Sequence, residues 1–172
     1  MIGFDDVQVG DALPGATFSI TRLDLVRYCG ASGDHNTIHW NERIAREVGL
    51  PGVIAHGMFT MATAVRIVTA WCGDPGAVVE YGVRFTKPVP VPDVGGAVLE
   101  VSAVVATRDE DARTVRVDLT VTIPDPDSAD GPDGGKVSVL GRAPGLAWTI
   151  AAVTMRSLKT STPEVSTSKL IR

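Results

Sequence analysis

The chain has 172 residues, of which 44% are hydrophobic and 21% are charged. This is enough for one domain with a buried core, and it excludes a disordered or collagen-like chain. The net charge of −4 and the pI near 5.3 give no indication of a nucleic-acid or membrane-surface partner. The longest apolar stretch, 57–72, contains Arg66 and is shorter than the ~20 residues that cross a bilayer.

The N-terminus has acidic residues where a signal peptide needs a cationic region and an apolar run. Two cysteines, Cys29 and Cys72, are too few for a disulfide framework and indicate a reducing compartment. We therefore expect a cytoplasmic protein.

The first half of the chain predicts helices. Thr21 is a candidate N-cap of a short helix that ends near Gly30, and residues 40–48 predict a second short helix. Residues 56–73 predict the longest helix, with Met58 among the apolar residues that recur at helical spacing. Its other faces are also largely apolar, so we expect it to be buried.

After Pro75 the period of the pattern changes to two. Apolar and polar residues alternate strictly over 114–123, which predicts a strand with one face on the core. Further strands are predicted at 80–86, 97–107 and 136–143. The sequence therefore predicts an α+β domain, one buried helix wrapped by a curved antiparallel sheet, whose open edge a second chain covers in a dimer.

Two segments are predicted to lie outside this packing. Ten of the twelve residues at 124–135 are Pro, Asp or Gly, which predicts a surface loop. Residues 144–172 carry four Lys or Arg against one Glu and show little apolar periodicity after Met155. We interpret 144–172 as a mobile extension of unknown role, so truncation after Ala143 is expected to leave the fold unchanged.

The densest group of reactive side chains is Gly33 to His39, GDHNTIH. Asp34 and His39 can face one cavity and form a general acid–base pair, which takes a proton from carbon and gives another to oxygen. The alternative is structural: Asp34 or Asn36 caps the following helix, and His39 is a core histidine.

A metal site is a second alternative. His35 and His39 are four residues apart, as on one face of a helix, but a zincin-type site has Glu directly after the first His, where this chain has Asn36. Three more side chains could complete a site, none at a diagnostic interval: Asp34, His56 and Cys29. The chain also has no nucleophile elbow and no phosphate-binding glycine loop, so we expect no metal and no nucleotide cofactor.

Gly57 stands at the start of the predicted long helix, in the run IAHGM. Its N–H has no intrahelical acceptor there and can bind a developing oxyanion, helped by the helix dipole. The alternative is a glycine that only permits close packing. With the acid–base pair, such a donor suits removal of the proton next to a thioester carbonyl.

The run Y-x-x-A-S-G-D-x-N-x-I-H, from Tyr28 to His39, resembles the hydratase signature of MaoC-like dehydratases and (R)-specific enoyl-CoA hydratases. AHGM and VEYGVRFTKPVPVPD resemble the same family, and the details are most similar to the B subunit of the mycobacterial-type (3R)-hydroxyacyl-ACP dehydratase. The resemblance covers about residues 3–143. Two features depart from the family: Thr37 replaces a common Pro, and the chain continues beyond Ala143.

The resemblance implies a hot-dog fold for residues 1–143, used as a homodimer or as a heterodimer with a second hot-dog subunit. It implies reversible syn dehydration of (3R)-hydroxyacyl thioesters, carried by ACP or CoA, to trans-2-enoyl thioesters in fatty-acid or mycolic-acid elongation. By position, Asp34 and His39 are then the catalytic pair, Gly57 N–H polarises the thioester carbonyl, and Asn36 supports the pair.

Three other functions remain open at this point. The first is an (R)-specific enoyl-CoA hydratase of β-oxidation or polyester supply. The second is a non-catalytic hot-dog subunit that shapes an acyl tunnel, which the presence of both Asp34 and His39 disfavours. The third is thioester hydrolysis, which uses a carboxylate and water without the Asp–Asn–His grouping.

Overall fold

The computed structural model describes residues 2–124, 135–141 and 152–156. The helices in this part of the chain are η1 (Phe4–Asp6), α1 (Arg22–Ser32), η2 (Thr37–His39), α2 (Glu42–Glu47), α3 (Gly57–Cys72) and η3 (Pro75–Ala77). The strands are β1 (Ala12–Ile20), β2 (Val78–Gly82), β3 (Arg84–Phe85), β4 (Ala97–Asp109), β5 (Thr114–Pro124), β6 (Lys136–Ser138), β7 (Leu140–Gly141) and β8 (Ala152–Arg156). In these ranges no helix is long and apolar enough to span a membrane.

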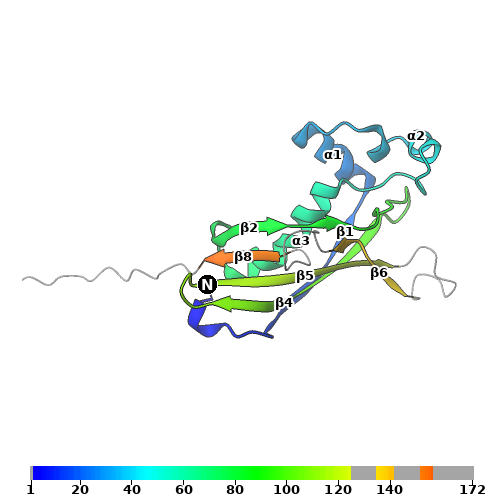
Figure 1. Cartoon of the computed structure of the whole chain (residues 1–172). Helices are drawn as coiled ribbons and strands as arrows, with labels where there is room; N and C mark the ends of the chain where they lie inside the picture. Colours follow the sequence, from blue (N-terminus) through cyan, green and yellow to red (C-terminus); the bar gives the residue numbers. More distant parts are fainter. Residues whose placement is uncertain (1, 125–134, 142–151, 157–172) are drawn as a thin grey trace, which may run out of the picture.

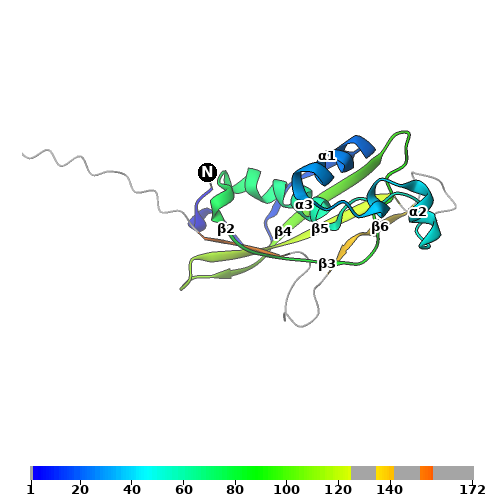
Figure 2. The ribbon, with the colours of Figure 1, turned by 90° about the horizontal axis from the view of Figure 1, so that it is seen from above.

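One long helix packs on a curved antiparallel sheet. The main sheet has the strand order β1-β4-β5-β8-β2, with β6 also paired to β5, while β3 and β7 form a short separate pair. Helix α3 lies along one face of the sheet, and α1 and α2 lie toward one end of it (Figures 1 and 2). The predicted α+β class and the wrapped helix are confirmed.

Strands β4 and β5 supply most of the sheet side of the core. Their inward residues alternate with outward ones, as the sequence predicted, and Leu99, Val117 and Leu119 have no solvent exposure. On the helix side, the buried positions of α3 include Ala64, Ile67 and Val68. These residues form one continuous apolar core between the two layers.

The buried face of α3 differs from the predicted stripe. Met58 is 58% exposed, whereas Thr60 and Thr63 are buried. Their hydroxyls donate to the carbonyl oxygens of His56 and Phe59, one turn earlier, at 3.2 and 2.8 Å. These backbone bonds satisfy the hydroxyls, so Thr60 and Thr63 can be buried in the core. Met58, which the apolar pattern placed in the core, is exposed instead.

Helix ends follow local signals, with small differences from the predicted bounds. The Thr21 side chain accepts the N–H of Asp24, as predicted for the N-cap of α1. The helix continues beyond Gly30 to Ser32, and Gly33, with a φ of 75°, ends it in a left-handed turn. The second short helix is confirmed but begins at Glu42, after Asn41 as its N-cap. Strand β1 was not predicted.

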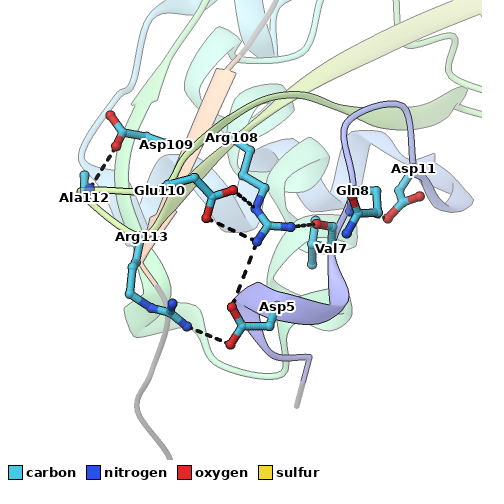
Figure 3. A network of polar contacts seen from close by, with 9 residues as sticks. All are labelled: Asp5, Val7, Gln8, Asp11, Arg108, Asp109, Glu110, Ala112 and Arg113. Carbon is cyan, nitrogen blue, oxygen red and sulfur yellow. Dashed lines mark hydrogen bonds and ion pairs between the residues drawn. The ribbon is translucent and has the colours of Figure 1, made fainter.

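The N-terminal turn η1 is fixed to the β4–β5 hairpin by two arginines (Figure 3). The Arg108 guanidinium donates to the carbonyl of Val7, and that of Arg113 pairs with Asp5 at 3.0 Å. Both guanidiniums also lie over the ring of Phe4, at 4.2 and 4.7 Å from its centroid. These cation–π and ionic contacts hold the start of the chain against the sheet.

The prediction that everything after residue 143 lies outside the fold is wrong for 152–156. These residues form β8, which is hydrogen-bonded to β5 on one side and to β2 on the other. The rest of the proposed extension, and most of the predicted loop at 124–135, lie outside the described residues.

Strands β6 and β8 pair with the same strand, β5, in the same antiparallel sense. Thr122 pairs with Ser138, and Asp118 pairs with Ala152. The residues of β5 in these two pairs are four apart in the chain, 122 and 118, whereas the residues paired with them are fourteen apart, 138 and 152. The predicted strand at 136–143 is therefore divided: β6 pairs with β5 and β7 pairs with β3, while β8 continues along the same side of β5.

Candidate active site

The turn between α1 and α2 carries the predicted acid–base pair. Gly33 reverses the chain at the end of α1, and the Asn36 side chain accepts the N–H of Ile38 at 3.3 Å, which starts η2 and places His39 at its end. Asn36 also donates its own N–H to Asp34 Oδ1 at 3.2 Å. The capping role considered for Asn36 is thus real, but it serves η2, and Asn41 caps α2.

Asp34, His39 and His56 converge at this turn. A carboxylate oxygen of Asp34 and one ring nitrogen of each histidine lie within 4.8 Å of one another. Asp34 is exposed, whereas His39 is 7% and His56 1% exposed. The sequence singled out Asp34 and His39 as a pair; it offered His56 only as a possible metal ligand.

The hydrogen bond of His39 selects its tautomer. His39 Nδ1 lies 2.8 Å from the carbonyl oxygen of Ile54. A carbonyl oxygen only accepts hydrogen bonds, so Nδ1 carries the proton of the neutral ring and Nε2 keeps a free lone pair. His39 is thereby prepared to accept a proton at Nε2.

His39 and Gly57 line a common cavity of about 330 Å³. Its other walls are mainly apolar and come from three segments: Ile54, Ala55 and Thr60; Phe85 to Val89; Val139 and Leu140. Asp34 and Asn36 are not among the lining residues. Of the four predicted site residues, two therefore face the cavity, and the other two lie in the turn beside His39.

Gly57 opens α3, so its N–H has no intrahelical acceptor, as the sequence predicted. A Cβ at this position would lie 3.0 Å from the ring of Phe85. Glycine therefore lets Phe85 pack directly over the helix start, where the helix dipole and an N–H without an intrahelical acceptor favour a developing negative charge.

The three converging groups are poorly arranged for a metal ion. The rings of His39 and His56 are stacked, with centroids 3.8 Å apart and planes 24° apart. The lone pair of a ring nitrogen lies in the plane of its ring, so two nearly parallel rings do not direct their lone pairs at one ion as a tetrahedral site requires. The geometry favours proton transfer over metal binding.

His56 is held in its neutral form. Burial lowers its pKa below the ordinary value of 6.5, and the neighbouring His39 lowers it further. The unfolded chain thus binds more protons than the folded one as the pH falls below 6.5, and the stability that neutral His56 contributes above this pH is lost.

The free energy of unfolding is therefore expected to fall between about pH 7 and pH 5, before most carboxylates titrate. Urea unfolding at both pH values measures this loss for the parent and for His56→Gln. We expect a smaller loss in the variant, because it has no histidine at this position to protonate. Equal losses would show that His56 does not contribute.

Comparison with known proteins agrees with the fold and the motifs. Residues 8–123 match the model of the MaoC like domain family. The 3-hydroxyacyl-thioester dehydratase X of Mycobacterium tuberculosis is 45% identical over 83 residues, which are 48% of this chain and 29% of that protein. The 3-hydroxybutyryl-CoA dehydratase of Methylorubrum extorquens is 28% identical over 129 residues, 74% of this chain and 79% of that protein.

Among solved structures, one described as a MaoC-like dehydratase superposes with a TM-score of 0.75 at 39% identity, over 91% of this chain and 42% of the other. This chain thus covers less than half of that structure and of dehydratase X. The likeness confirms the hot-dog fold that the resemblance implied. Because the family model matches more than half of its length, the chain belongs to the MaoC like domain family.

Proposed function

We propose that the chain is a hydro-lyase that interconverts (3R)-hydroxyacyl thioesters and trans-2-enoyl thioesters. The observation that carries this proposal is that His39, whose Nδ1 is bonded to Ile54, and Gly57 at the start of α3 line the same cavity. Relatives named 3-hydroxyacyl-thioester dehydratase and 3-hydroxybutyryl-CoA dehydratase support the same chemistry. We place the activity in fatty-acid or mycolic-acid elongation, with ACP or CoA as the carrier.

In the hydration direction, His39 Nε2 takes a proton from water as the water oxygen bonds to C3 of the enoyl thioester. The electrons of the C2–C3 double bond move toward the carbonyl oxygen, where Gly57 N–H stabilises the enolate. His39 passes the proton taken from water to Asp34, and Asp34 delivers a proton to C2, so both groups return to their starting forms. A carboxylate oxygen of Asp34 and a ring nitrogen of His39 lie within 4.8 Å of each other.

In the dehydration direction the same steps run backward. Asp34 removes the α-proton, and protonated His39 gives a proton to the departing hydroxyl, which leaves as water. We assign Asp34 to the α-carbon and His39 to the oxygen; the bond of His39 Nδ1 to Ile54 supports a proton-exchanging role for Nε2 in either assignment. Neither direction needs a metal or an organic cofactor.

Steady-state rates on enoyl thioesters with the same acyl chain, carried by CoA or by ACP, test this function. We expect hydration of at least one of them, and a preference for ACP if the chain serves elongation. A preference for CoA would favour the alternative, an (R)-specific hydratase of β-oxidation or polyester supply. Release of free thiol without hydroxyacyl product would instead indicate thioester hydrolysis.

We also propose that the chain works as a dimer. Strand β2 is an edge of the main sheet, and its Val79 is 49% exposed. Near it in the chain, Phe85 is 47% exposed, and Met58 at the start of α3 is also exposed. An open strand edge with apolar neighbours favours pairing with another hot-dog chain, either a second copy or a different subunit.

Sedimentation of the purified chain tests this proposal. We expect a dimer when the chain is its own partner, and a monomer that dimerises on addition of a second hot-dog subunit when it is not. A fully active monomer would contradict the proposal. Val79→Lys, which places a charge on the exposed edge, is expected to weaken the dimer, whereas Val94→Lys, at an exposed residue of the β3–β4 connection, is the matched control.

A further inference from the structure

His56 occupies the centre of the site without facing the cavity. Its Nε2 lies 3.2 Å from the backbone carbonyl oxygen of Asp34 and 3.5 Å from Cys29 Sγ. One face of its ring stacks on His39 at 3.8 Å, and Tyr28 packs at 4.7 Å with its plane tilted by 59°. His56 thus touches both members of the proposed catalytic pair.

We propose that His56 is a positioning residue: its Nε2–H anchors the Asp34 peptide and its ring face holds the imidazole of His39. This role rests on the proposed function, because it is defined by the acid–base pair. His56 does not exchange a proton with the substrate; it keeps the two groups that do at their working separation.

The contacts assign one tautomer to His56. The Asp34 carbonyl oxygen can only accept, so Nε2 carries the proton and Nδ1 has the lone pair. In the part of the chain that the structure describes, Nδ1 is buried and has no hydrogen-bond partner. A second proton there would be buried without an acceptor, so the ring remains a neutral donor.

Asp34 needs this anchor because its turn is exposed. Its carboxylate accepts the N–H of Asn36, a bond within the same turn that does not tie the turn to the rest of the protein. The His56 bond links the Asp34 peptide to the residue that precedes α3, and therefore to the core. Without it, the carboxylate can drift relative to the cavity.

His39 needs the stack for a different reason. Its bond to Ile54 fixes Nδ1 but allows the ring to rock about that bond. The His56 ring, nearly parallel at 3.8 Å, blocks this motion on one face. Tyr28 packs against His56 and also against Phe59, at 5.2 Å, so the supporting ring is itself held in place.

Two substitutions separate the two roles. His56→Gln keeps an N–H donor of similar reach but removes the ring; His56→Phe keeps a flat ring but removes the donor. Among the described residues, the Cys29 thiol, Asp34 and His39 are titratable groups close to His56, and the Tyr28 ring packs against it. Cys29→Ala is the matched control. It changes a neighbour of Nε2 and leaves both proposed contacts intact.

We expect His56→Phe to lower kcat by ~10²-fold with little change in KM, as displacement of a catalytic group by about 1 Å does. His56→Gln is expected to recover part of this loss, and Cys29→Ala to stay within a few-fold of the parent. Thermal unfolding of each variant shows whether it is folded. A parental kcat for folded His56→Phe, or an equal loss in Cys29→Ala, would overturn the proposal.

Nitrogen NMR of the imidazole rings gives a readout that needs no activity. In the parent we expect protonation of His56 at Nε2 and of His39 at Nδ1. In His56→Gln we expect His39 to keep its Nδ1 proton, because Ile54 still accepts it, but to show greater ring motion in relaxation measurements. A parent His56 protonated at Nδ1, or unchanged ring motion of His39 in the variant, would overturn the positioning role. An inactive parent with the expected spectra would instead refute the proposed function.

Discussion

Replacement of Asp34 by Asn, or of His39 by Ala, is expected to lower kcat for enoyl-thioester hydration by ~10²–10⁴-fold. Each change removes one half of the proton exchange: the group that serves C2, or the free Nε2 that serves the oxygen. The fold of Asp34→Asn should persist, because position 34 is exposed and the new amide oxygen can still accept the N–H of Asn36. Initial rates and thermal unfolding of the purified variants measure both effects.

His35→Ala is the matched control for these variants. His35 lies between the two sites in sequence and is exposed, and it contributes its backbone carbonyl, not its ring, to the bond from Trp40. We expect its activity to stay within a few-fold of the parent. Activity at the parental level in folded Asp34→Asn or His39→Ala would remove these residues from the mechanism.

Truncation after Ala143 is expected to prevent correct folding. It removes β8, which lies between β5 and β2 and supplies the hydrogen-bonded neighbour of β2 in the main sheet. Without β8, β2 loses its partner in the main sheet and is detached from it, and one side of β5 is unpaired over Thr114 to Asp118. This expectation replaces the one drawn from the composition of residues 144–172.

Truncation after Ser157 is the matched control, because it retains β8. Far-ultraviolet circular dichroism and thermal unfolding distinguish the two proteins: we expect a cooperative transition only in the longer one. A shorter protein that unfolds cooperatively at the parental temperature would show that β8 is dispensable for the fold.

Much of the fold could be predicted because its signals are local. The alternation in β5, the Thr21 cap and the apolar spacing in α3 each lie within one element and depend little on the rest of the chain. Strand β8 could not be predicted in this way. It completes a strand position that begins at β6, and only pairing with β5 shows that the two segments belong together.

The candidate site shows the same difference between local signals and contacts that depend on the fold. Asp34 and His39 stand five residues apart, so one turn can bring them together, and their spacing was informative. His56 comes from a different segment and reaches Asp34 and Cys29 only because the end of α1 packs against the start of α3. The sequence showed only that His56 precedes Gly57 at the start of the long helix. This position did not indicate a contact between His56 and the acid–base pair.

Hydration of a trans-2-enoyl thioester in D₂O tests the central claim most directly. If Asp34 delivers a proton to C2 while His39 activates water, the product is the (3R)-hydroxyacyl thioester with one deuterium at C2, added on the same face as the hydroxyl. Proton NMR and chiral analysis of the product determine both features. A (3S) product, or a deuterium on the opposite face, would contradict the account.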